Sequence, residues 1–267
     1  MKRKLSLLLV AVMVISMILG ACESQSQVIT TGSLKGNVSL DVETDIAPTS
    51  PEDPADIDVD LNLELPERDF SVDVSGVSPQ EFLTDAAKNF SKEDLEKLKE
   101  MSLMDLAKLI VVRKNLMADL QYVFEKTGIA VKLDEKTGEA NLDATILFDL
   151  NEYAVSQEGK DLLRKFMKVY TFVLCHEKYS QYVSGMVIEG HTDSSGEYEY
   201  NAWLSQARAD AVLEYILSEE CGECPDSFRE NITATGYAWD QLVYDENGEE
   251  DMDASRRVTF RFLFQLP

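Results

Sequence analysis

Positive charge is scarce in this chain. Its 267 residues include 25 Lys and Arg against 49 Asp and Glu, which gives a formal net charge of −24. A chain with this balance repels nucleic acid and anionic lipid, so neither is expected as a partner. The sequence has only two His and contains no HExxH motif, no GxSxG motif and no Cys–His constellation, so it lacks the usual hydrolase signatures.

Cysteine is rare as well, with four residues in the whole chain. Cys22 is assigned below to a lipid anchor, which leaves Cys175, Cys221 and Cys224. Outside the cytoplasm an odd number allows at most one disulfide among them. Cys221 and Cys224 form a single CxxC pair, and neither His stands at a metal-ligand spacing from it. A local disulfide or a reduced pair is therefore favoured over half of a metal site, and no metal or cofactor is expected.

The N-terminus carries a short apolar run. Leu5–Leu19 contains fifteen residues, fewer than the roughly 20 that cross a bilayer as a helix. Basic residues precede it, and Gly20-Ala21-Cys22 follows, the small-residue pattern of a bacterial lipobox. We expect residues 1–21 to be a signal peptide and Cys22 to carry acyl chains such as palmitate. The anchor would lie in the outer membrane or on the outer face of the cell membrane. An ordinary secretory signal or an uncleaved anchor is the alternative.

An acidic stretch follows this anchor. A net charge of −24 less the three basic residues of the leader puts the mature chain near −27. Twelve acidic residues lie between Asp41 and Asp73 against one base, Arg68. This composition predicts that residues 22–78 form an extended, disordered acidic tether. Residues 58–65 alternate at period two, so a strand is the alternative there.

Helical periodicity begins at Pro79. A Ser N-cap precedes this Pro at the first helical position, and Ser91 gives a second start signal. Apolar residues then recur at three- and four-residue spacings, and Gly128 stands just past the expected end. The pattern predicts one or two short helices and then a long one within residues 79–127. The apolar stripe of the long helix needs a partner. That partner is either the next domain or a second copy, and a homodimer through residues 104–126 is favoured.

Strand and helix patterns alternate from residue 129 onward. Residues 129–133 and 139–143 predict a hairpin with Gly138 in its turn, and Ile146–Phe148 predicts an apolar strand. Further strands are expected at residues 186–188, 232–234 and 258–266, and helices at 157–174 and 200–218. Two strand–helix–strand units with an added strand predict a two-layer α/β sandwich of the α+β, βαβαβ type over residues 129–267.

One stretch carries a recognisable chemistry. The strand 186–188 runs into Glu189-Gly190-His191-Thr192-Asp193, and the helix after it contains Asn201, Ser205 and Arg208 on one face. Asp193 and Arg208 are fifteen residues apart, so a short loop can set them facing each other over the end of the sheet. Such a pair can hold a zwitterionic amino-acid head group, because Asp takes the ammonium and Arg takes the carboxylate as a fork. A buried structural salt bridge between the two is the alternative.

These residues resemble the peptidoglycan-binding domain at the C-terminus of OmpA, MotB and Pal proteins. The resemblance covers about residues 129–266, and its most specific part runs from Ile188 to Ala211. In that family the domain binds the diaminopimelate-type residue of peptidoglycan stems through an aspartate and an arginine, which match Asp193 and Arg208. The supporting residues of the family correspond to Asn151, Thr192, Asn201 and Arg256. The resemblance implies a lipid-anchored, non-catalytic protein that ties a membrane to the cell wall.

The sequence departs from the family pattern at four places. Ser255 stands where Asn is usual, and Ala238 stands where a second Gly is usual. Residues 174–185 and 221–229 look longer than the pattern requires. The first two changes affect loops at the rim of the expected site, and the central pair is intact.

Two other functions compete with wall binding. A cell-wall amidase or peptidase would use His191, Asp193 and His176, although His191 is expected to hydrogen-bond its loop rather than to perform chemistry. An ion-driven stator subunit of the MotB kind needs an acidic residue inside a true membrane span, and Leu5–Leu19 has none.

Overall fold

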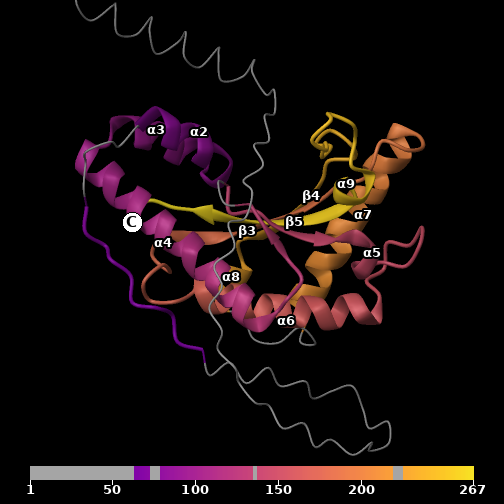
Figure 1. The fold of residues 1–267 in the computed structure, drawn as a ribbon, viewed down its shortest axis with the longest axis horizontal. Coiled ribbons are helices and arrows are strands. Elements are labelled where there is room, and N and C mark those ends of the chain that lie inside the picture. Colours follow the sequence, from indigo (N-terminus) through magenta and orange to yellow (C-terminus); the bar gives the residue numbers. More distant parts are fainter. Residues whose placement is uncertain (1–62, 73–78, 135–136, 219–224) are drawn as a thin grey trace, which may run out of the picture. The chain divides into compact units, whose positions relative to one another are not determined.

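A five-stranded mixed sheet with packed helices forms the fold (Figure 1). The computed structural model describes residues 63–72, 79–134, 137–218 and 225–267. The strand order is β1-β2-β5-β3-β4, in which β3 and β4 are parallel and the other neighbours are antiparallel. The strands are β1 Lys132–Leu133, β2 Ala140–Asp143, β3 Val183–Gly190, β4 Ile232–Gly236 and β5 Arg257–Phe264. The helices are α2 Pro79–Ala86, α3 Lys92–Glu100, α4 Leu103–Thr127, α5 Ala144–Leu147, α6 Gln157–Leu174, α7 Tyr198–Leu217, α8 Asp226–Arg229 and α9 Met252–Ser255, and a 3₁₀ turn spans Ala87–Asn89. The predicted α/β class is confirmed.

The core lies on one face of the sheet. Alternate residues of β5 contribute their side chains to it. Val258, Phe260, Phe262 and Phe264 are all buried, as the period-two pattern predicts. Phe166 of α6 packs against Phe260 with ring centroids 4.5 Å apart. Phe124 of α4 stacks on Phe166 at 5.7 Å. At this point the packing therefore runs from β5 to α6 and then to α4.

Two glycines allow α7 to pack closely against β3 and β4. A Cβ added to Gly190 would lie 2.1 Å from the Ser205 carbonyl oxygen, and one added to Gly236 would lie 2.3 Å from the Gln206 nitrogen. Any larger residue would push the helix away. Ser205 Oγ accepts a hydrogen bond from the Ala238 N–H at 2.9 Å, which ties the loop after β4 to the same helical turn. These contacts fix the distance between the end of β3 and the side chains of α7.

Helix boundaries follow capping signals in the sequence. Helix α6 covers the predicted residues 157–174 and begins after Ser156, whose hydroxyl accepts the Gly159 N–H at 2.9 Å. Helix α4 ends at Gly128, which has a left-handed φ of 64° and donates its N–H to the Phe124 carbonyl. The short helices and the long helix predicted within residues 79–127 are confirmed.

The apolar stripe of α4 is buried inside the chain. Its members are Leu106, Leu109, Leu116, Leu120 and Phe124, of which the most exposed is Phe124 at 5%. Phe124 stacks on Phe166 and Tyr170 of α6. The stripe itself therefore packs within the chain, the other partner that the sequence allowed, and the homodimer through residues 104–126 stays a prediction. A stripe in a sequence shows that a helix needs a partner but does not say which one.

Residues 63–72 form an extended segment against α4, which we name the strap. Arg68 Nε donates to Asp119 Oδ1 of α4 at 2.6 Å, and the Tyr179 hydroxyl donates to the other oxygen, Oδ2, at 2.6 Å. The strap thus differs from the disordered tether predicted over residues 22–78, because the Arg68–Asp119 ion pair and a contact between the rings of Phe70 and Tyr179, 6.4 Å apart, hold it in place. The rest of that range lies outside the described residues.

The sequence pattern predicts a strand at Ile146–Phe148, but the chain forms α5 there. Asp143 Oδ1 accepts the Thr145 N–H at 2.8 Å, which caps this helix and ends β2. Phe148 follows in extended backbone and bridges to Val155. A short apolar run suits a buried helical turn as well as a strand, so periodicity alone could not separate the two.

The predicted signal peptide, the predicted lipidation of Cys22 and the Cys221–Cys224 pair all fall outside the described residues. In the parts that the structure does describe, no helix has both the length and the apolar character needed to cross a membrane. The same parts contain no group of three or more His, Cys, Asp or Glu placed to hold a metal ion.

Candidate functional site

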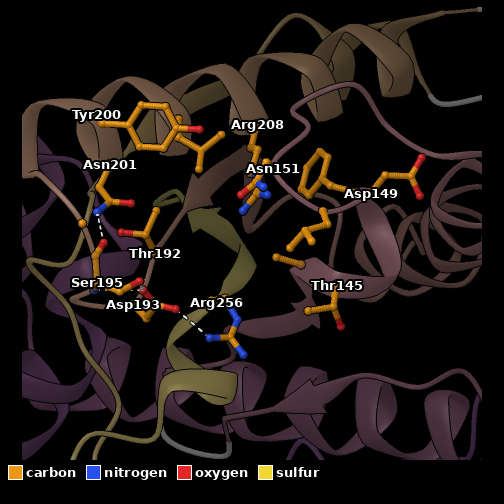
Figure 2. Close-up of a pocket in the computed structure, with 15 residues that line it drawn as sticks. Thr145, Asp149, Asn151, Thr192, Asp193, Ser195, Tyr200, Asn201, Arg208 and Arg256 are labelled. Carbon is orange, nitrogen blue, oxygen red and sulfur yellow. Dashed lines mark hydrogen bonds and ion pairs between the residues drawn. The ribbon is translucent and has the colours of Figure 1, made fainter.

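The six residues predicted to bind a ligand surround one pocket of about 610 Å³ (Figure 2). They are Asn151, Thr192, Asp193, Asn201, Arg208 and Arg256. They come from the turn after α5, the loop after β3, helix α7 and the residue before β5. Because β3 and β5 are antiparallel neighbours, the end of the first lies beside the start of the second. The sheet and α7 together therefore assemble the pocket.

Asp193 is 7% exposed, and its carboxylate is already held. Oδ1 accepts hydrogen bonds from the Ser195 N–H at 3.0 Å and from the Ser195 hydroxyl, and Oδ2 accepts one from Arg256 Nη1 at 2.6 Å. Burial raises the pKa of Asp193, but these hydrogen bonds outweigh it and hold the pKa below its usual value. The carboxylate is thus charged at neutral pH. A carboxylate has about four lone-pair sites, so it can accept a further donor from the pocket.

Arg208 is positioned by a carbonyl and an aromatic ring rather than by a carboxylate. Its Nε donates to the Glu152 carbonyl at 3.1 Å, and its guanidinium carbon lies 4.9 Å from the centre of the Phe148 ring. Figure 2 shows the side chain reaching from α7 into the pocket. Burial lowers the pKa of Arg208, but a guanidinium stays charged in proteins. Among the described residues no carboxylate pairs with Arg208, so its two Nη nitrogens face the pocket without an acidic partner.

The alternative interpretation, a direct salt bridge between Asp193 and Arg208, is therefore wrong. Asp193 pairs instead with Arg256, and the two guanidinium groups lie on the same pocket. The sequence correctly places Asp193 and Arg208 at one site, but it does not reveal that a second arginine takes the structural role. That arginine is 63 residues away from Asp193 in the chain.

Two neutral polar side chains, Thr192 and Asn201, also line the pocket. Thr192 is 4% exposed, and its Oγ1 has no hydrogen-bond partner within the described residues. Asn201 is buried and donates from Nδ2 to the Ser195 carbonyl at 2.7 Å, which steadies the loop that holds Asp193. A buried hydroxyl without a partner costs free energy, so a ligand that supplied the missing hydrogen bond to Thr192 would recover it.

The sequence comparison agrees with this geometry. Residues 147–256 match the sequence model of the OmpA family. Residues 147–256 are an OmpA family domain. The family resemblance inferred from the residues around Asp193 and Arg208 is thereby confirmed, and the match begins at Leu147 and ends at Arg256.

Three curated relatives share the OmpA domain to different extents. Outer membrane protein Omp38 of Acinetobacter baumannii is 30% identical over 135 residues, which make up 50% of this chain and 34% of Omp38. Zorya protein ZorB of Escherichia coli is 27% identical over 193 residues, 68% of this chain and 80% of ZorB. The peptidoglycan-associated lipoprotein of Buchnera aphidicola is 30% identical over 124 residues, 46% of this chain and 64% of that protein. The chain thus spans about a third of Omp38 and most of ZorB.

His191 lies behind the pocket of the OmpA domain and does not line it. Its ring is 1% exposed and stacks on Tyr237 with centroids 5.6 Å apart. Neither ring nitrogen has a hydrogen-bond partner among the described residues, and the Glu189 carboxylate is 3.9 Å from Nε2. The predicted hydrogen bond from this side chain to the loop is therefore wrong. Burial lowers the pKa of His191 to about 2, so the imidazole is neutral in the folded domain.

The residues of the peptidase alternative are not brought together. His176 lies in the turn before β3, whereas His191 and Asp193 follow the other end of that strand. A general base must reach the proton that it abstracts. A His at the far end of a strand and a shielded neutral imidazole do not meet this requirement.

The pocket also depends on residues that the sequence did not single out. Phe148 supports the guanidinium of Arg208, and Ser195 occupies one oxygen of Asp193. The Asp-Ser-Ser-Gly sequence from residue 193 is typical of an Asx turn and is a signal that would have identified Ser195. The contact between Phe148 and Arg208 has no such signal, because it depends on how α5 and α7 pack.

Both departures from the family pattern at the rim are accommodated. Ser255 is fully buried, and its Oγ accepts a backbone N–H at 2.9 Å. Ala238 adopts a φ of 48°, and its carbonyl accepts the Thr192 N–H at 2.9 Å. The Glu250 carboxylate accepts the Ser194 N–H at 2.9 Å as well as the hydroxyl of Ser194. Loops on two sides therefore hold the segment that carries Asp193.

Proposed function

We propose that the OmpA domain binds the zwitterionic end of a diaminopimelate-type residue in a peptidoglycan stem peptide, without catalysing a reaction on it. The observation that carries this proposal is the arrangement of Arg208. Its Nε and its planar face are held by Glu152 and Phe148, while its Nη nitrogens have no acidic partner in the described chain. A guanidinium prepared in this way suits a carboxylate that arrives with a ligand.

The remaining pocket residues fit the other half of such a ligand. Asp193 would accept the ammonium group, at the lone-pair positions that Ser195 and Arg256 leave open. Thr192 Oγ1 would supply or accept a hydrogen bond that it lacks in the described structure. Arg256 would neutralise Asp193 in part, so the pocket would favour a ligand that carries both charges over a simple cation.

The chain outside the OmpA domain would supply the link to a membrane. Lipidation of Cys22 and an acidic tether over residues 23–62 would place the domain in the cell envelope, outside the cytoplasm. One relative is named a peptidoglycan-associated lipoprotein and another is named an outer membrane protein, and both names support this location. The protein would thereby tie a membrane to the cell wall.

Isothermal titration of the mature chain with two stem peptides tests the role of Arg208. One peptide carries diaminopimelate, and the other carries Lys at the same position, which lacks the second carboxylate. Arg208→Ala should weaken binding of the diaminopimelate peptide by about 30-fold or more, since removing one partner of a desolvated charge pair costs about 2–5 kcal/mol. It should change binding of the Lys peptide little. Arg208→Lys should also bind poorly, because a point charge cannot reproduce the fork.

Arg164→Ala is a matched control, because it removes the same charge from α6, where Arg164 pairs with Asp161 at 3.0 Å. It should bind both peptides like the wild type. Circular dichroism checks that each variant is folded. If Arg208→Ala folds and binds the diaminopimelate peptide as tightly as the wild type does, the assignment of this pocket is wrong.

Labelling with a fatty-acid analogue in cells tests the anchor separately. The wild type should be labelled and Cys22→Ser should not, because the thiol is the acylated group. Equal labelling of both would remove Cys22 from the proposal and leave the pocket assignment standing.

A further inference from the structure

Three aromatic side chains form an exposed surface beside the pocket, which we name the aromatic platform. They are Tyr153 at 47%, Tyr200 at 48% and Trp203 at 52% exposure. The Trp203 ring centroid lies 5.6 Å from that of Tyr153 and 5.8 Å from that of Tyr200. Large aromatic side chains usually bury most of their surface, so three neighbouring rings that stay half exposed mark a surface for recognition.

The platform is continuous with the pocket. Tyr200 itself lines the pocket, and Figure 2 shows its ring on the α7 side, next to Asn201. Leu150, another pocket residue, is 90% exposed and lies in the turn just before Tyr153. A ligand that occupies the pocket and extends past Tyr200 therefore meets the platform directly.

The platform is also fixed relative to the charged residues of the pocket. Glu152, the neighbour of Tyr153, accepts the Arg208 Nε hydrogen bond through its carbonyl at 3.1 Å. Tyr200 and Trp203 stand three residues apart on α7, the helix that carries Arg208, and so share one face. One helix and one anchored turn thus hold both surfaces.

We propose that the aromatic platform binds the sugar rings of the glycan strand to which the stem peptide is attached. This inference rests on the proposed function of the pocket. The C–H faces of a pyranose ring are apolar and pack on aromatic rings, while its hydroxyl and acetamido groups can bond to the Tyr hydroxyls and the indole N–H at the edges. The ligand chemistry is an uncharged N-acetylated hexosamine.

The covalent structure of the wall favours this occupant over others. A diamino acid in the third position of a stem is separated from its sugar by two residues, about 7 Å when extended. A stem held by Arg208 and Asp193 therefore carries its sugar past the rim of the pocket, where the platform begins at Tyr200. An uncharged glycan also avoids the repulsion that a chain with a net charge of −24 imposes on anionic partners.

Titration of the mature chain with two ligands that differ only in the sugar tests this proposal. The first is the free diaminopimelate tripeptide, and the second is the same tripeptide joined to its N-acetylglucosamine–N-acetylmuramic acid disaccharide. The disaccharide ligand should bind the wild type about tenfold more tightly, the gain expected from one good aromatic contact. Trp203→Ala should remove this gain and leave the affinity for the free tripeptide unchanged. Trp203→Phe should keep part of it.

Leu217→Ala is the matched control, because Leu217 is an exposed apolar residue at the other end of α7. It should keep the full preference for the disaccharide ligand. Equal affinity of the wild type for both ligands would overturn the platform proposal while leaving the pocket intact, and would point to a protein partner for these rings. A Trp203→Ala variant that keeps the preference would overturn it as well. If neither ligand binds the wild type, the proposed function itself fails.

Discussion

Two aspartates in this chain have similar partners in different surroundings. Asp119, on α4, accepts from Arg68 at 2.6 Å and from the Tyr179 hydroxyl at 2.6 Å. Asp193, in the pocket, accepts from Arg256 at 2.6 Å and from Ser195. Each thus has one arginine and one hydroxyl. The first has no exposed surface, whereas the second opens onto a pocket that Arg208 also lines.

The difference lies in whether the charges are matched within the chain. At the strap the carboxylate of Asp119 pairs with the guanidinium of Arg68, and neither charge is left without a partner. At the pocket Arg256 pairs with both Asp193 and Asp253, whereas Arg208 has no acidic partner among the described residues. A fully paired set of charges holds parts of the chain together, whereas a charged side chain without a partner in a cavity can bind a ligand of opposite charge. The geometry of the paired aspartate alone does not distinguish the two sites, but the arginine without an acidic partner, Arg208, does.

Replacing the pocket aspartate should separate binding from stability. Asp193→Asn keeps the shape of the side chain but removes the charge, so the diaminopimelate peptide should bind about 30-fold or more weakly. The free energy of unfolding should fall by only about 1 kcal/mol, because Arg256 regains water when its partner is neutral. Calorimetric titration and urea unfolding measure the two quantities. A large loss of stability with full binding would show that Asp193 resembles Asp119 after all.

The opposite result is expected at the strap. Asp119→Ala leaves Arg68 and the buried Tyr179 hydroxyl without an acceptor, which should lower the free energy of unfolding by about 3 kcal/mol. Binding of the stem peptide should be unchanged at temperatures where the variant is folded. Asp210→Ala, an exposed position on α7, is the control and should change stability little. Unfolding of Asp119→Ala at the wild-type urea midpoint would contradict the structural role.

Acid should weaken the region behind the pocket through His191. Burial lowers the pKa of His191 to about 2, against about 6.5 in an unfolded chain. Protonation therefore favours unfolding, and the stability present above pH 6.5 should be lost as the pH falls, by at most about 1.4 kcal/mol per pH unit. Urea unfolding at pH 7, 6 and 5 measures this slope. His191→Gln should flatten it; an unchanged slope in that variant would assign the loss to other groups.

The smallest effect is expected from a neutral residue of the pocket. Asn201→Ala removes the hydrogen bond to the Ser195 carbonyl, and binding should weaken by about 0.5–1.5 kcal/mol. Gln121→Ala on α4 removes an exposed amide and serves as the control. A loss in Asn201→Ala as large as that in Asp193→Asn would mean that loop order, rather than charge, decides binding.

Local signals in the sequence were sufficient for most of the elements. Ser156 and Gly128 fix the ends of two helices through their own backbone contacts, and the alternation in β5 gives its buried face. The helical conformation of Ile146–Phe148 could not be predicted from the pattern of this run itself, because the residue that caps the helix, Asp143, lies outside the run. The apolar stripe of α4 likewise predicts a buried helix face, but its pattern does not indicate which segment covers that face.

The site was predictable in membership and not in pairing. The motif places Asp193 and Arg208 in one pocket because both stand at fixed distances from a strand end. Which arginine bonds to Asp193 depends on how β5 lies beside β3, a contact between segments far apart in the chain. The aromatic platform depends in the same way on a turn and a helix that only folding brings together.

The strap has a mechanical consequence under the proposal that Cys22 is anchored in a membrane. A pull on the chain from its N-terminal side reaches the strap before it reaches any described helix, so the Lys178–Pro66 hydrogen bond and then the Arg68–Asp119 ion pair bear the load first. If both contacts rupture, the ten residues of the strap lengthen the chain between the pulled end and the domain by up to about 35 Å. The pocket, which rests on α7 and the sheet, would stay assembled during this extension. A pulling force between membrane and cell wall would thus first extend the chain at the strap, before it could pull the domain off its ligand.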